Sequence, residues 1–107
     1  MDRKVKDTRT ESERQKAVKK LLKQLGFSVW STSQGRKSAV TKGVPDLIFA
    51  GRGVCGFIEM KALTKQSPEQ VAFMENVRGN GGTYLVVHNE GDIIEFVNTI
   101  AWNSGKD

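Results

Sequence analysis

The sequence has one cysteine, one histidine and no long apolar run. A single cysteine, Cys55, excludes an internal disulfide framework and a zinc site built from thiolates. Because Cys55 lies in the apolar stretch 54–58 without an activating neighbour, we expect a small buried side chain and not a nucleophile. No apolar run reaches the roughly 20 residues that span a bilayer, and the opening MDRKVKDTRT lacks a secretory signal. These absences predict an intracellular protein with no membrane segment.

Acidic residues are outnumbered, because 12 Asp and Glu stand against 17 Lys and Arg and leave a formal charge of +5. Such a balance suits a polyanionic partner. The length of 107 residues suits one domain over 1–107, and we expect its polar ends, 1–10 and 103–107, to be frayed.

Hydrophobic periodicity predicts the order helix, three strands, helix and two strands, or αβββαββ, followed by one short helix. The expected helices cover 11–26, 67–79 and 98–102, and the expected strands cover 27–31, 45–50, 54–62, 81–88 and 92–97. Strands on both sides of a helix imply a crossover connection. The predicted fold is therefore of the α/β class, with a mixed β-sheet flanked by helices.

The second helix has a clear start at SPEQ. Ser67 can cap it, Pro68 suits the first helical position, and Gln70 completes a capping box. The apolar side chains expected to point inward from this helix are Val71, Met74 and Val77.

The segment 43–61, GVPDLIFAGRGVCGFIEMK, gathers charge in an apolar setting. Side chains alternate along a strand, so Glu59 and Lys61 are expected on one side. Asp46 begins the neighbouring strand and is expected to face the same spot. Two acids this close repel unless a cation lies between them, and carboxylate oxygens without Cys or His favour Mg²⁺ or Mn²⁺.

A divalent ion at this spot lowers the pKa of a bound water and neutralises charge on a phosphate. Lys61 would then position the attacking water or stabilise the transition state. The predicted chemistry is phosphodiester hydrolysis.

Asp46, followed after a hairpin by Glu59-x-Lys61, is similar to the PD-(D/E)XK nuclease signature. The wider pattern GVPDLIF, GFIEMKA and SPEQVAFMENVRGNGGTYLVVH resembles the VRR-NUC branch of that superfamily, whose stand-alone members occur in phages. The resemblance runs from about residue 11 to about residue 88. It implies a restriction-endonuclease-like core and a metal-dependent endonuclease acting on DNA. It also implies selectivity for branched DNA such as a junction or flap, a homodimer that cuts two strands, and no small-molecule cofactor.

The resemblance also implies roles for further residues. The family has an acidic metal ligand in its first helix, and Glu11 is the favoured candidate because it shares a stripe with Val18 and Leu22, with Glu13 as the alternative. The backbone carbonyl of Met60 is a further metal ligand in the family. Gln70 matches a glutamine that lies near the site in relatives, but a capping-box role accounts for it equally well.

Several other residues have two interpretations. The basic loop residues Arg36, Lys37 and Lys42 precede GVPD and either hold phosphates or are simply solvated. For His88 we expect a hydrogen-bonded or exposed imidazole, and for Trp30 and Trp102 core or interface anchors.

Three functions compete at this stage. The first is a metal-dependent deoxyribonuclease. The second is a catalytically inactive nucleic-acid-binding module of the same fold, and the third is an unrelated basic α/β domain whose charges are structural. Intact Asp46, Glu59 and Lys61 favour the first.

Overall fold

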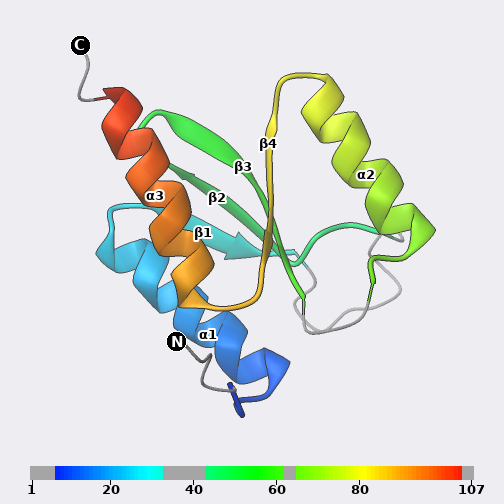
Figure 1. Ribbon diagram of the computed structural model, residues 1–107, viewed down its shortest axis with the longest axis horizontal. Helices are drawn as coiled ribbons and strands as arrows, with labels where there is room; N and C mark the ends of the chain where they lie inside the picture. Colours follow the sequence, from blue (N-terminus) through cyan, green and yellow to red (C-terminus); the bar gives the residue numbers. More distant parts are fainter. Residues whose placement is uncertain (1–6, 33–42, 62–64, 105–107) are drawn as a thin grey trace, which may run out of the picture.

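The computed structural model describes residues 7–32, 43–61 and 65–104, with side chains as far as residue 100. Within these residues the chain forms three helices and four strands (Figure 1). They are α1 (Glu11–Gln24), β1 (Ser28–Ser31), β2 (Leu47–Gly51), β3 (Val54–Met60), α2 (Pro68–Gly79), β4 (Thr83–Val87) and α3 (Glu90–Ser104). The predicted loop residues Arg36, Lys37 and Lys42 lie outside the described residues.

The four strands form one mixed sheet in the order β1-β2-β3-β4. The first three are antiparallel neighbours, and β4 is parallel to β3. The pair Gly51 and Val54 closes the β2–β3 hairpin, and the two residues between them, Arg52 and Gly53, both have positive φ (54° and 80°). This is the backbone that two-residue hairpin turns require. The parallel pair needs a crossover, which α2 provides. The predicted mixed α/β sheet is confirmed.

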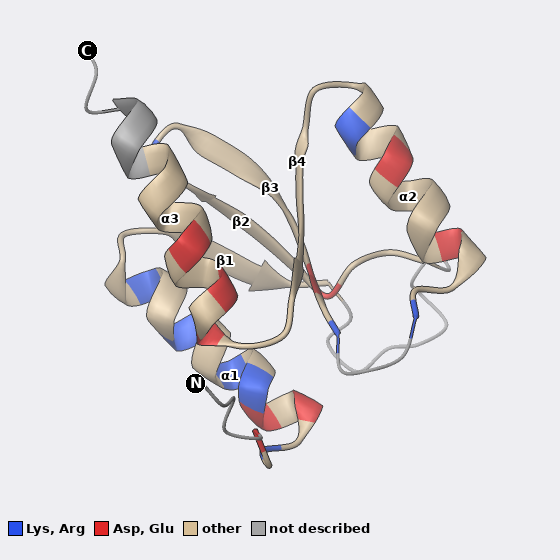
Figure 2. Ribbon diagram, in the orientation of Figure 1, with Lys and Arg blue, Asp and Glu red and all other residues tan. Residues whose placement is uncertain are grey.

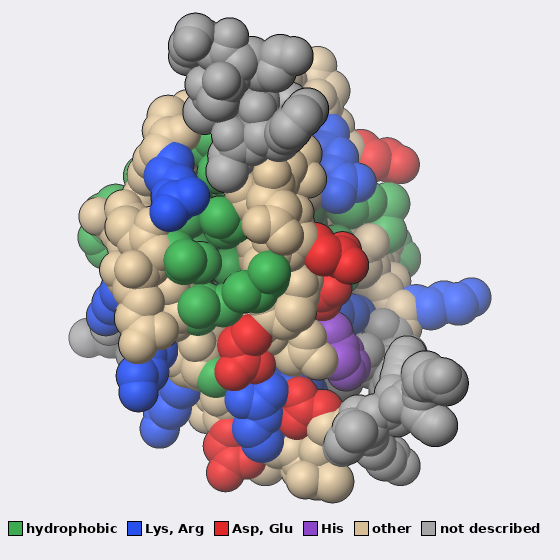
Figure 3. All heavy atoms as spheres, turned by 60° about the vertical axis from the view of Figure 1, so that its left-hand side comes forward, with side chains coloured by type: hydrophobic (Ala, Val, Ile, Leu, Met, Phe, Trp, Pro, Cys, Tyr) green, Lys and Arg blue, Asp and Glu red, His purple; other side chains and the backbone are tan. Residues whose placement is uncertain are grey.

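Helices α1 and α3 cover one face of the sheet, where the main core lies (Figure 1). The buried core comprises Val18, Leu22, Phe27, Leu47, Phe49, Ile58, Met60, Val87, Ile93 and Val97. Phe49 stands at its centre, with the rings of Phe27 and Phe96 packed edge-on at 5.7 Å. Figure 3 brings this side forward and shows hydrophobic side chains gathered at its centre with charged side chains around them.

The opposite face of the sheet is covered only in part, by α2. Phe73 of α2 packs against Phe57 and Tyr84, at 5.2 and 6.2 Å between ring centroids. All residues of α2 are half-buried or exposed, so Val71, Met74 and Val77, which were expected to point inward, are only half-buried.

This thin cover bears on two predictions. Cys55 is exposed, although a buried side chain was expected. Trp30 is 53% exposed, which contradicts a core role and leaves the interface role as a prediction. Cys55 lies on the same, less covered face of β3 as Phe57 and Glu59, because residues two apart along a strand share a face. Its apolar neighbours in the sequence therefore do not enclose it. The side chain of Trp102 lies outside the described residues.

The largest correction concerns residues 92–97, DIIEFV, which belong to α3 and not to a strand. The observed order is therefore αβββαβα, and Asn98 lies inside a helix instead of capping one. The apolar residues recur at helical spacing, because Ile93 and Val97 are four apart and both are buried. No helix within the described residues is long and apolar enough to cross a membrane.

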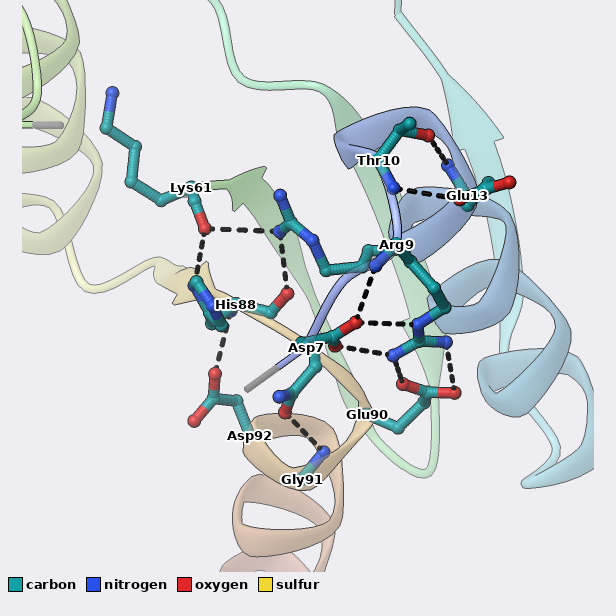
Figure 4. A network of polar contacts seen from close by, with 11 residues as sticks. Asp7, Arg9, Thr10, Glu13, Lys61, His88, Glu90, Gly91 and Asp92 are labelled. Atoms are coloured by element: carbon teal, nitrogen blue, oxygen red, sulfur yellow. Dashed lines mark hydrogen bonds and ion pairs between the residues drawn. The ribbon is translucent and has the colours of Figure 1, made fainter. Parts of the chain in front are cut away.

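The chain is structured closer to both ends than expected. Thr10 caps α1 in a capping box with Glu13, and Arg9 pairs with both Asp7 and Glu90, at 2.7 and 2.8 Å (Figure 4). These contacts tie residues 7–10, which were predicted to be frayed, to the start of α3. Residues 103 and 104 likewise continue α3.

Truncating Ile93 tests the helical assignment of this segment. Ile93→Ala should reduce the free energy of unfolding by about 2–5 kcal/mol, because the side chain is fully buried. Glu95→Ala is the control, since it would share a face with Ile93 in a strand but is exposed in α3, and it should change stability by less than about 0.5 kcal/mol. Urea denaturation measures both. Equal losses would contradict the helix.

Candidate active site

Strand β3 delivers its side chains to two faces, as predicted. Ile58 and Met60 enter the core beneath α1 and α3, while Glu59 projects from the other face. Glu59 is nevertheless fully buried, with 0% of its surface exposed. A buried carboxylate needs compensation from hydrogen bonds or a cation.

Asp46 lies immediately before β2 and faces the end of β3. Its Oδ2 accepts a hydrogen bond from the backbone N–H of Met60, at 2.8 Å. Burial raises the pKa of Asp46 above its usual value, and the negative charges of Glu11 and Glu59 raise it further. The N–H of Met60 and the charge of Lys61 act in the opposite direction. The two predicted acids therefore share one electrostatic environment.

The two oxygens of the Glu59 carboxylate have different partners. Oε1 accepts hydrogen bonds from the hydroxyl of Tyr84 at 2.6 Å and from Nε2 of Gln66 at 2.8 Å. Oε2 is buried and has no hydrogen-bond partner within the described residues. Burial raises the pKa of Tyr84, and its bond to Glu59 raises it further, so the phenol stays protonated and remains a donor.

The ammonium of Lys61 completes the predicted group. Its Nζ lies 3.8 Å from Oε2 of Glu59 and 3.5 Å from Oε1 of Gln70. The same Gln70 oxygen accepts from the N–H of Ser67 at 2.8 Å, within a capping box that starts α2. The two interpretations of Gln70 are therefore compatible in space, because one amide oxygen both caps the helix and faces Lys61.

The backbone of Lys61 is held from three sides, which Figure 4 shows in part. Its N–H donates to the carbonyl of Val87 at 2.9 Å. Its carbonyl faces Nδ1 of His88 at 2.9 Å and Nη1 of Arg14 at 3.4 Å. A ring nitrogen that faces a carbonyl must carry hydrogen, so His88 is a hydrogen-bonded imidazole, as expected.

The two acids of the first turn of α1 differ. Glu13 accepts a hydrogen bond from the N–H of Thr10 at 2.8 Å, so its carboxylate is engaged in the helix cap. Glu11 is exposed, and its charge contributes to the raised pKa of Asp46. Figure 2 shows acidic residues on this turn and at the ends of the central strands. Of the two acids, Glu11 is the one whose charge acts on the site.

The donor set suits a hard divalent cation. Among the residues that the structure describes, no three His, Cys, Asp or Glu side chains lie close enough together to hold a metal ion as they stand. The unpartnered Oε2 of Glu59, with Asp46 nearby, is nevertheless the kind of buried oxygen that a cation satisfies. Carboxylate oxygens without thiolate or imidazole favour Mg²⁺ or Mn²⁺.

Three residues around the site were missed by the sequence analysis: Arg14, Gln66 and Tyr84. Arg14 is only 5% exposed, and its Nη1 donates to the carbonyl of His88 at 3.0 Å as well as to Lys61. Its spacing of four from buried Val18 was an available signal. Tyr84 and Gln66 approach Glu59 from other elements, and no local pattern marks them.

A known protein is similar to this chain in its overall structure. No family model matches the sequence, and no curated protein matches it. A solved structure described as a VRR_NUC domain is similar to this chain, with a TM-score of 0.69 and 30% sequence identity. The match covers 82% of this chain and 94% of that structure.

The raised pKa of Asp46 predicts a pH dependence of stability in the presence of chelator. The folded state favours the protonated carboxyl, so the free energy of unfolding should fall as pH rises from the usual pKa of 3.8 through the folded value. Asp46→Asn keeps an acceptor for the N–H of Met60 and removes the charge. Urea denaturation from pH 3 to 7 should show that the free energy of unfolding of the variant increases relative to that of the wild type as pH rises. A constant difference would contradict the shift.

Proposed function

Because the chain belongs to the VRR-NUC family of nuclease domains, we propose that it is a divalent-metal-dependent endonuclease that hydrolyses phosphodiester bonds in DNA. The observation that supports this most directly is the pairing of Lys61 with Glu59, whose Oε2 is buried and lacks a hydrogen-bond partner among the described residues. A buried ion pair stabilises the fold little when one oxygen of its carboxylate has no hydrogen bond, so a purely structural role explains this pair poorly.

The proposed metal ligands are the carboxylates of Asp46, Glu59 and Glu11 and the backbone carbonyl of Met60. When bound, Mg²⁺ or Mn²⁺ supplies a water of lowered pKa and neutralises charge on the phosphate. The raised pKa of Asp46 supports this assignment: burial raises it first and the charges of Glu11 and Glu59 raise it further, and a bound cation would offset both effects.

Lys61 acts on the reacting phosphate in this proposal. Its ammonium lies 3.8 Å from Oε2 of Glu59, beside the proposed metal site. There it orients the attacking water or stabilises negative charge that develops on the phosphate oxygens. Gln70 contributes by holding Nζ of Lys61 through its amide oxygen. Arg36, Lys37 and Lys42 would contact phosphates on either side of the cleaved bond, which agrees with the net charge of +5.

We further propose that the substrate is branched DNA and that the protein acts as a homodimer. A chain of 107 residues has little surface with which to enclose a duplex, so recognition of a bent or branched shape through phosphates is favoured. Two copies related by a two-fold axis would bring two sites to two strands.

Cleavage assays test the proposal. With Mg²⁺ or Mn²⁺, the protein should cut a labelled four-way junction or flap faster than duplex or single-stranded DNA. Glu59→Gln and Lys61→Ala should each lower the rate by at least about 100-fold, because each removes a charged group that acts on the reacting phosphate. Glu75→Gln and Lys23→Ala change exposed residues of α2 and α1 and should cut normally.

Two results would contradict this assignment in different ways. Junction binding without cleavage under any metal would favour the inactive binding module. Cleavage that survives in Glu59→Gln and Lys61→Ala would place the chemistry elsewhere.

Light scattering after size exclusion tests the homodimer. The expected mass is twice 11.9 kDa. Within residues 92–97 of α3, Ile94 is the exposed apolar side chain, at 45% exposure, and it is the first candidate for the dimer contact. Ile94→Asp should therefore yield monomers, while Thr99→Asp, which adds the same charge on another side of α3, should not. A wild-type monomer at high protein concentration would overturn the dimer.

A further inference from the structure

The carboxylate of Glu59 is held asymmetrically. Oε1 is engaged by two donors, the hydroxyl of Tyr84 at 2.6 Å and Nε2 of Gln66 at 2.8 Å. Oε2 lies 3.8 Å from the ammonium of Lys61 and makes no hydrogen bond among the described residues. Because the whole side chain is buried, turning the carboxylate would break two hydrogen bonds where water cannot replace them.

Packing against two residues of α2 restricts the ring that carries the Tyr84 hydroxyl. Tyr84 belongs to β4, where it pairs with Phe57 of β3. The ring of Phe73 from α2 packs against the Tyr84 ring, and the Arg78 guanidinium lies over it at 5.9 Å. Arg78 also donates to the backbone carbonyl of Tyr84, at 2.8 Å. The hydroxyl thus approaches Glu59 from a ring that has little freedom to move.

We propose that Tyr84 and Gln66 are positioning residues that restrict Glu59 to one metal-facing oxygen, so that the site selects Mg²⁺ and Mn²⁺ over Ca²⁺. Mg²⁺ demands a compact octahedral shell and takes carboxylates through single oxygens. Ca²⁺ accepts six to eight oxygens and gains from carboxylates that offer both. A Glu59 whose Oε1 is occupied therefore denies Ca²⁺ a ligand without cost to the smaller ions. This inference rests on the proposed metal dependence.

Isothermal titration calorimetry with Mn²⁺ and with Ca²⁺, without DNA, tests the inference. Tyr84→Phe retains the ring that packs on Phe73 and removes the hydroxyl. The dissociation constant for Mn²⁺ should rise by about tenfold, because a partner that orients a metal ligand is lost. The constant for Ca²⁺ should change by less than about threefold, because the freed Oε1 becomes available to it. The wild-type preference for Mn²⁺ should therefore shrink.

Two further variants make the test decisive. Gln66→Met removes the other donor from a half-buried position outside the sheet, so it should shift the preference in the same direction even if Tyr84→Phe fails to fold. Glu75→Gln changes an exposed residue of α2 that donates nothing to Glu59, and it should leave the preference unchanged. Circular dichroism establishes that each variant is folded.

The outcomes separate this inference from the proposed function. If the wild type binds Mn²⁺ but both donor variants weaken Mn²⁺ and Ca²⁺ by the same factor, the positioning role is overturned and the nuclease proposal stands. A Glu75→Gln protein that loses the preference as strongly as Tyr84→Phe would also overturn it. If the wild type binds neither ion, the metal dependence fails and this inference fails with it.

Discussion

Strand β3 sends alternate side chains to the two faces of the sheet, and the position of every site residue depends on that register. Ile58 and Met60 anchor it in the core beneath two helices, which leaves Glu59 facing the other way. A shift of one residue would exchange these roles and place a carboxylate in the apolar layer. The burial of Ile58 and Met60 stabilises this register of β3, and the same register places Glu59 at the site.

The end of β3 joins the core layer to the site. The carbonyl of Lys61 accepts from Arg14 of α1 and faces the ring of His88, which follows β4. Arg14 also holds the carbonyl of His88 at 3.0 Å. Because buried Arg14 donates to the carbonyls of both Lys61 and His88, its loss would remove two hydrogen bonds at once. The side chain of Lys61 thus projects from a backbone that is fixed by residues distant in sequence.

Local patterns predicted much of this architecture. The hairpin between Asp46 and Glu59, the SPEQ helix start and the convergence of Asp46, Glu59 and Lys61 all arise within short stretches or one hairpin, where spacing determines geometry. The partners of Glu59 were not predictable in this way, because Tyr84 reaches it through a parallel pairing across a crossover helix. The predicted strand at 92–97 failed because a short apolar run fits both periods, and packing against β4 and α1 decided for the helix.

The two-residue turn between β2 and β3 has a consequence for the order in which the protein assembles. Hairpins of this kind form in about 1–10 μs, whereas parallel pairing must wait for a long connection to close. Asp46 and Glu59 belong to the hairpin, while Tyr84 arrives with β4 after α2. The two like charges therefore meet while solvent can still screen them, and the docking of β4 with α2 is the step that removes water from Glu59.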